Sequence, residues 1–165
     1  MKQDDDKRPK AVAAALSRIP ELNDARSLRA LIANARRLDA REVEEAAIRR
    51  LLEVRADAEP GDAVPGSPEH EMWRVIGAIE EMKSEVAGKT IRLSYLRRDI
   101  QNLGVVPAMD KLVSKPGTSE RFDELIAAGR HDLTAEAVVL KYREAFSAAA
   151  IARAEERLAA IEQEP

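Results

Sequence analysis

Apolar residues recur every three or four positions along most of the chain, which is the spacing of amphipathic helices. Asp24 and Asp39 are expected to cap the first two long helices, and Glu42 follows Asp39 at capping-box spacing. The connection between these helices is short, which predicts an antiparallel hairpin. Their two apolar stripes consist of Leu28, Leu31, Ile32 and Ala35, and of Val43, Ala47, Ile48, Leu51 and Val54.

Helical signals continue through the second half of the chain. Ser67 is a good N-cap residue, and Pro68 fits the first helical position after it. We find no alternating stretch typical of a strand, since the flanks of VVLKY are helical. We therefore expect an all-α fold, a compact bundle of about seven to nine short helices. The helices expected here span 68–87, 91–103 and 106–114, followed by three begun by Thr118 or Ser119, by Thr134 and by Ser147.

Proline, glycine and charge divide the chain into four parts. Residues 1–9 are charged and lack apolar periodicity, which indicates a disordered tail. Residues 10–55 form the N-terminal helical hairpin, preceded by a short helix that begins at Lys10 and ends before Pro20. The sequence ADAEPGDAVPG predicts a linker over 56–66, and a C-terminal helical bundle over 67–165.

Two segments of the chain resemble each other. Leu31–Leu51 aligns with Leu125–Phe146 when one residue is inserted, and both contain Leu-Ile-Ala, an arginine and an Ala-rich helix. Two hairpins of similar construction, a weak internal repeat, would explain this. Chance similarity between amphipathic helices rich in Ala, Arg and Leu is the alternative.

Composition narrows the class of protein. The 165 residues include 45% hydrophobic but only 3% aromatic residues, so aliphatic side chains must fill the core. A net charge of −3 argues against a protein that coats nucleic acid with its whole surface. Cysteine is absent, and no segment is typical of a signal peptide or a membrane span. We therefore expect a cytoplasmic protein with no membrane contact.

Basic residues concentrate in the middle of the chain. Residues 83–115 contain seven basic and three acidic residues, a local charge of +4. Residues 1–82 contain 14 basic and 17 acidic residues, and residues 116–165 contain 6 and 10. The middle segment is therefore an electropositive region in an otherwise acidic chain. Its basic residues are Lys83, Lys89, Arg92, Arg97, Arg98, Lys111 and Lys115.

The predicted helix 91–103 divides into two faces. Leu93, Leu96, Ile100 and Leu103 form its apolar stripe. The other face would present side chains that bond phosphates and base edges, as a helix-turn-helix reader does. An ordinary solvated helix face is the alternative. The nucleic-acid-binding candidates are Ser94, Arg97, Arg98, Gln101 and Asn102 on this helix, with Lys89, Arg92 and Lys111 at nearby phosphates.

Candidate catalytic groups are sparse. His70 and His131 have no second ligand at metal spacing, and neighbouring glutamates on a helix diverge. We therefore expect no enzyme, no metal and no cofactor, with a hidden hydrolase-type activity as the alternative. Tyr95 and Trp73 are expected to pack in or beside the core, although both could stack on single strands.

The C-terminal sequence AAAIARAEERLAAIE is rich in alanine. Small side chains allow close helix approach, so this helix could form a homodimer. Simple packing within the fold is the alternative.

The segments GKTIRLSYLRRDIQNLGVV, LIAAG and LTAEAVVLKYREAFS resemble an uncharacterised bacterial all-helical family. The resemblance covers about half of the chain and implies a setting of mobile-element or defence-type nucleases, without assigning any catalytic residue. Together with the basic segment 89–111, it favours a non-enzymatic interaction module that binds DNA or a DNA-associated protein. A protein-binding scaffold or adaptor with no nucleic-acid contact is the alternative.

Overall fold

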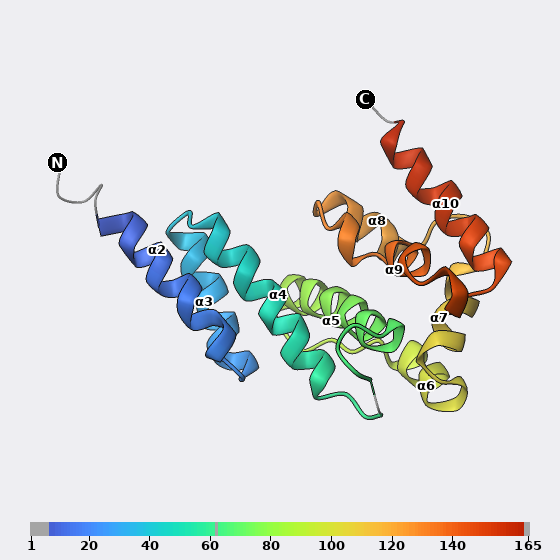
Figure 1. Ribbon diagram of the computed structural model, residues 1–165, viewed down its shortest axis with the longest axis horizontal. Coiled ribbons are helices and arrows are strands. Elements are labelled where there is room, and N and C mark those ends of the chain that lie inside the picture. Colours follow the sequence, from blue (N-terminus) through green and yellow to red (C-terminus); the bar gives the residue numbers. More distant parts are fainter. Residues whose placement is uncertain (1–6, 62, 164–165) are drawn as a thin grey trace. The chain divides into compact units, whose positions relative to one another are not determined.

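The computed structural model describes residues 7–61 and 63–163, and its regular structure there is helical throughout. Over these two ranges the chain forms nine α-helices and three short 3-10 helices, and no strand (Figure 1). The prediction of an all-α fold with seven to nine short helices is confirmed. The chain divides into two compact units, with the boundary between Ala58 and Glu59.

The first unit is a long helical hairpin with a shorter helix against it. Arg8 of the first helix donates hydrogen bonds from Nη2 to the backbone oxygens of Leu38 and Asp39, at 3.2 and 2.9 Å. These bonds attach that helix to the turn of the hairpin. The elements are α2 (Lys7–Arg18), η1 (Ile19–Glu21), α3 (Ala25–Arg37) and α4 (Arg41–Asp57).

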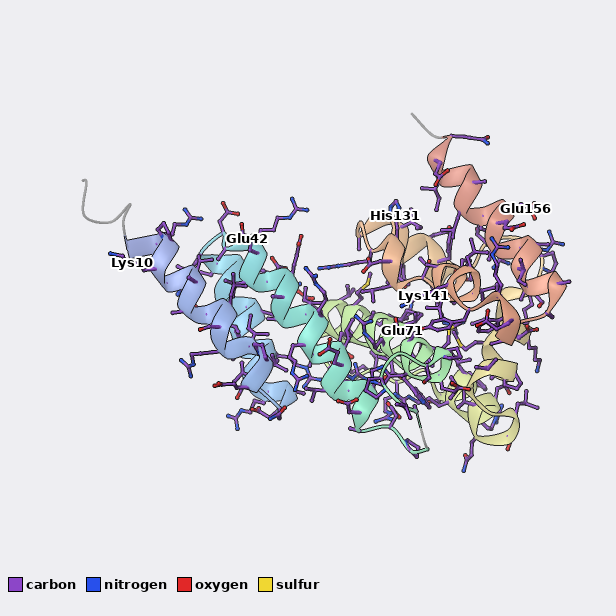
Figure 2. The ribbon with its side chains drawn as sticks, in the orientation of Figure 1. Lys10, Glu42, Glu71, His131, Lys141 and Glu156 are labelled. Carbon is purple, nitrogen blue, oxygen red and sulfur yellow. The ribbon has the colours of Figure 1, made fainter. Side chains whose placement is uncertain are left out.

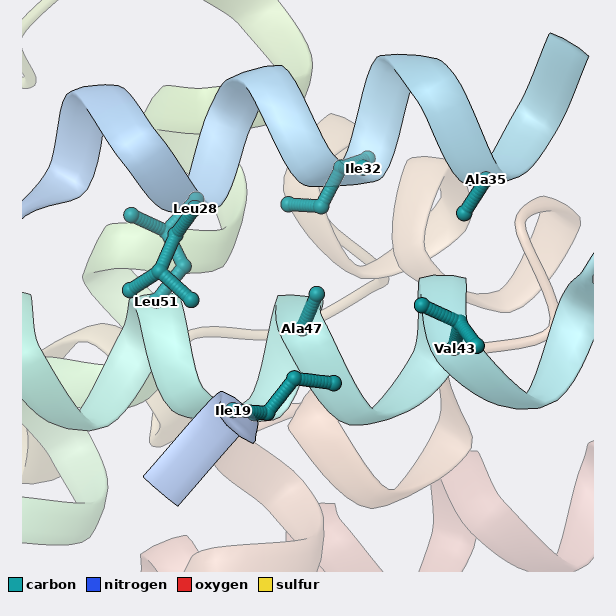
Figure 3. Packing of buried hydrophobic residues seen from close by; sticks show 7 residues of the cluster. All are labelled: Ile19, Leu28, Ile32, Ala35, Val43, Ala47 and Leu51. Atoms are coloured by element: carbon teal, nitrogen blue, oxygen red, sulfur yellow. The ribbon is translucent and has the colours of Figure 1, made fainter. Parts of the chain in front are cut away.

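The hairpin encloses an aliphatic core. Leu28, Ile32 and Ala35 on α3 face Leu51, Ala47 and Val43 on α4, and Ile19 of η1 belongs to the same buried cluster (Figure 3). The pairing runs in opposite directions along the two helices, as the short connection predicts. The apolar stripes expected from the sequence are thus the packed faces.

Three expectations for the first part of the chain differ from the structure. Asp39 does not cap α4, because it has a φ of 53° and the N-cap position belongs to Ala40, which makes no side-chain cap bond. Residues 7–9 of the expected disordered tail are helical, and residues 1–6 lie outside the described residues. The expected linker also begins later, since α4 continues through Asp57.

The second unit is built around a single helix, α5 (Pro68–Ala87). Its buried residues, among them Met72, Trp73 and Ile76, lie on most sides of the helix, which is typical of a core helix. The expected caps are present, because the hydroxyls of Ser67, Ser119, Thr134 and Ser147 each accept a backbone N–H. The other elements are α6 (Ser94–Leu103), α7 (Val105–Val113), α8 (Glu120–Ala127), η2 (His131–Leu133), α9 (Ala135–Lys141), η3 (Arg143–Ala145) and α10 (Ala148–Glu162).

The two segments that resemble each other in sequence differ in structure. Leu31–Leu51 contains the turn of a hairpin between helices of 13 and 17 residues. Leu125–Phe146 contains the end of α8, two 3-10 turns and the seven-residue α9. The resemblance therefore does not extend to helix length.

Polar side chains cover the outside of the helices, among them Lys10 on α2 and Glu42 on α4 (Figure 2). None of the described helices combines the length and the apolar character that a bilayer span requires.

Candidate functional site

The basic segment begins with a non-helical stretch that is bonded to α5. Gly88 ends α5 in the left-handed conformation, with φ 65°. One turn apart on α5, Ser84 Oγ and Glu80 Oε1 accept the backbone N–H groups of Ile91 and Leu93, at 2.8 and 2.9 Å. Because these N–H groups are bonded to side chains of α5, the chain is not helical before Ser94. Helix α6 therefore begins at Ser94, three residues later than the sequence predicts.

Arg97 is not available for recognition, contrary to the sequence prediction. Its guanidinium bonds both oxygens of Glu80, at 2.7 and 2.8 Å, and both oxygens of Glu59, at 2.7 and 2.9 Å. Glu80 is fully buried, and the Arg97 side chain is only 15% exposed. The burial of a carboxylate requires such a charge partner, so Arg97 stabilises the second unit.

Trp73 completes this cluster. The Arg97 guanidinium lies over the indole ring, 5.3 Å from its centroid, and Trp73 is buried as the sequence predicts. The hydrogen bonds that Arg97 donates to Glu80 and then to Glu59 raise the pKa of Arg97 above its ordinary value. The Arg97 charge is therefore fixed, and it orients α6 so that a different face points outward.

The outward face of α6 centres on Tyr95 and Arg98. Tyr95 is 79% exposed, so the expectation that it packs in or beside the core is wrong. The Arg98 guanidinium lies 5.2 Å from the Tyr95 ring centroid, one helical turn further along. The single carboxylate of α6, Asp99, lies 3.7 Å from Lys111. The centre of this face thus combines an aromatic ring with a cation.

Most of the predicted residues are exposed, either on α6 or on the stretch before it. Lys111 is also exposed, but it lies on α7 and pairs with Asp99. Leu103 is 48% exposed, so its assignment to the buried stripe is wrong. We call the following exposed residues the α6 surface: Lys89, Arg92, Ser94, Tyr95, Arg98, Gln101 and Asn102.

The α6–α7 pair differs in geometry from the DNA-binding helix-turn-helix motif. A single residue, Gly104, joins the two helices, whereas the DNA-binding motif has a turn of three or four residues. The second helix, α7, buries Ala108, Met109 and Val113 and carries one basic residue. Any contact that the α6–α7 pair makes with nucleic acid would therefore use the outer face of α6 and the stretch before it.

Buried charge also occurs near the C-terminus. Arg157 donates to Glu136 Oε1 at 2.7 Å and to the Lys115 backbone oxygen. Both side chains line a pocket of about 20 Å³, which has room for a water-sized molecule. The described lining contains neither histidine: His70 is buried in the first turn of α5, and His131 is exposed before α9 (Figure 2).

The Ala-rich helix α10 uses part of its small-residue surface within the fold. Ala150 and Ala154 are fully buried, whereas Ala148, Ala152 and Ala159 are exposed. Packing within the unit therefore explains the first two. Formation of a homodimer through the others stays a prediction.

Sequence reasoning missed a second basic surface, on α3. That helix has four arginines and no acidic residue, and all four arginines are exposed. The charge count over residues 1–82 concealed them, because it added the carboxylates of α4 and of the N-terminal residues. A separate count for each predicted helix would have found them.

Comparison with known proteins assigns no function to these surfaces. No protein-family model matches the chain, and no curated protein or solved structure matches it either.

Proposed function

We propose that this protein is a non-enzymatic DNA-binding module, and that its α6 surface binds unpaired bases. The observation that carries the proposal is the exposed Tyr95 ring with the Arg98 guanidinium across it. Proteins that bind single strands combine such aromatic platforms with cations that follow the phosphate backbone. Lys89 and Arg92, exposed on the preceding stretch, supply those cations.

The rest of the α6 surface supports this assignment. Ser94, Gln101 and Asn102 are exposed and can donate to and accept from base edges. An exposed aromatic residue is also uncommon in this chain, which has only five aromatic residues. Bonding between α5 and the stretch before α6 fixes the backbone on which these side chains stand, so little ordering is needed on binding.

Fluorescence anisotropy with a labelled oligothymidine strand tests the proposal. The wild-type chain should bind at 50 mM salt and more weakly at 150 mM, because phosphate contacts release counterions. Tyr95→Ala should weaken binding by about tenfold, the effect of losing one stacked base. Lys141→Ala is the matched control, because Lys141 is exposed and lies over another tyrosine, Tyr142. No binding at 50 mM salt, or equal affinity for Tyr95→Ala and the wild type, would contradict the proposal.

A protein partner at the same surface is the second candidate. Tyrosine and arginine are the residues most enriched at binding hot spots, and the partly exposed Leu103 at the end of α6 would add apolar area. A partner that survives nuclease treatment and is lost with Tyr95→Ala, together with no anisotropy change on DNA, would favour this alternative.

A further inference from the structure

The first unit has its own basic face. Helices α2 and α3 together contain eight basic residues and no acidic residue, whereas α4 contains four basic and five acidic residues. Charge is therefore unevenly distributed among the helices of this unit, because α2 and α3 contain only cations and α4 contains both signs. Positive charge concentrated on a protein surface raises the concentration of polyanions near that surface.

The buried and the exposed side chains of α3 lie on opposite faces of the helix. Leu28, Ile32 and Ala35 are buried against α4. At 3.6 residues per turn, the positions directly opposite them are Arg26, Ala30, Ala33 and Arg37, and all four are exposed. Arg26 and Arg37 are about 16 Å apart along the axis, at a rise of 1.5 Å per residue.

Side chains on the two flanks extend this pattern. Arg29 and Arg36 are exposed on one side, where Arg36 also pairs with Glu44. On the other side, Ser27 and Asn34 are exposed, and Asn34 Oδ1 accepts a bond of 2.7 Å from Arg37. The outer face of α3 therefore has small side chains at its centre and polar or cationic side chains around them.

We propose that this outer face of α3 binds duplex DNA, with Ala30 and Ala33 against the duplex and Arg26 and Arg37 at its phosphates or base edges. The major groove admits an α-helix, and small central residues allow the helix backbone to approach it closely. Arginine and asparagine are the side chains that bond guanine and adenine edges in that groove. The proposal does not depend on the α6 surface, because its residues, its unit and its ligand are different.

Anisotropy with a labelled 20-base-pair duplex and the full chain tests it. Arg26→Gln with Arg37→Gln should weaken duplex binding by about tenfold or more. The slope of log affinity against log salt should fall by about two, one for each lost phosphate contact. Ala33→Leu, which changes no charge, should also weaken binding because it separates the helix from the duplex.

Arg41→Gln with Arg49→Gln is the matched control. It removes the same charge from the same unit, at two exposed positions on α4 that lie near Glu45. Circular dichroism should show that every variant keeps its helix content. The proposal is overturned if the wild type does not bind the duplex at 50 mM salt, if the control weakens binding as much as the α3 variant, or if Ala33→Leu binds as well as the wild type.

The single-strand probe separates this proposal from the one for the α6 surface. The Arg26 and Arg37 variant should bind oligothymidine within about twofold of the wild type, while Tyr95→Ala should bind the duplex within the same margin. Loss of both activities in one of these variants would show that the two surfaces are not separate sites, and would overturn the assignment of the duplex to α3.

Discussion

Arg97 and Glu80 form a two-point ion pair in the second unit, with Nε–Oε1 and Nη2–Oε2 distances of 2.7 and 2.8 Å. Glu80 Oε1 also accepts the backbone N–H of Leu93, the residue that precedes α6. One buried carboxylate therefore fixes both the start of α6 and its rotation about its own axis. The same pair decides which residues of α6 face solvent.

Removal of Arg97 should destabilise the second unit. Arg97→Ala leaves the buried Glu80 carboxylate without its charge partner, which should lower the free energy of unfolding by about 3 kcal/mol. Trp73, the only tryptophan, reports this unit in a fluorescence-monitored urea titration. Arg98→Ala is the control, since this exposed residue should change stability by about 0.5 kcal/mol or less. Equal losses for the two variants would contradict the structural role of Arg97.

The contribution of Arg97 should not depend on pH near neutrality. Its pKa is raised in the folded state, so the stabilisation from its charge is complete below the ordinary arginine pKa and is lost only as pH rises through the folded value. The difference in unfolding free energy between the wild type and Arg97→Lys should therefore be constant from about pH 6 to pH 9. A difference that falls steadily over that range would contradict the assignment.

Asp24 should make the first unit sensitive to acid. Its carboxylate accepts the backbone N–H of Ser27 at 2.7 Å as the N-cap of α3, and this bond lowers the pKa of Asp24. A lowered pKa means that the stabilisation is present above the ordinary carboxyl value and is lost as pH falls through the folded value. Urea unfolding followed by circular dichroism at pH 7 and pH 3 should show a larger loss for the wild type than for Asp24→Ser. Serine also caps helices but does not titrate.

Asp110 should anchor the start of α10. Its Oδ2 accepts the Ser147 backbone N–H at 2.6 Å, and its Oδ1 accepts the Ser147 hydroxyl at 2.9 Å. Asp110→Ala removes both bonds and should cost about 1–2 kcal/mol. Hydrogen exchange should accelerate in the first turn of α10, with Asp123→Ala on α8 as the control. Unchanged exchange in that turn would show that Asp110 does not hold it.

Gly104 should resist substitution. Its φ of 91° and ψ of 164° lie in a region that is essentially restricted to glycine, although a β-carbon there would meet Pro107 at an ordinary distance of 3.6 Å. Gly104→Ala should therefore cost about 1–3 kcal/mol through backbone strain alone. Tryptophan-monitored unfolding measures this cost, and Asn102→Ala in the last turn of α6 is the control. A change equal to that of the control would contradict the strain.

Local sequence signals predicted the helices well. The caps at Asp24, Ser67, Thr134 and Ser147 are where the sequence places them, because each depends on a hydroxyl or carboxylate that bonds an N–H three residues later. The apolar stripes of α3 and α4 also follow from spacing alone, since a helix with one apolar stripe must bury it.

The tertiary structure determines which side chains of α6 are buried and which are exposed. In sequence, Arg97 and Arg98 are equivalent basic residues on a polar face, and spacing cannot tell them apart. The difference arises because Glu59 and Glu80, 38 and 17 residues earlier in the chain, bond only the first of them. Tyr95 is exposed for the same reason, since the rotation that directs Arg97 inward directs Tyr95 outward.

The sequence by itself therefore determined the helical class, most helix boundaries and the presence of a basic segment. Those properties depend on contacts within three or four residues and on composition. Only the tertiary structure decided which cations are buried in ion pairs and which aromatic ring reaches solvent. These properties depend on long-range pairing of charges, whose energy is set by burial and geometry that no local pattern contains.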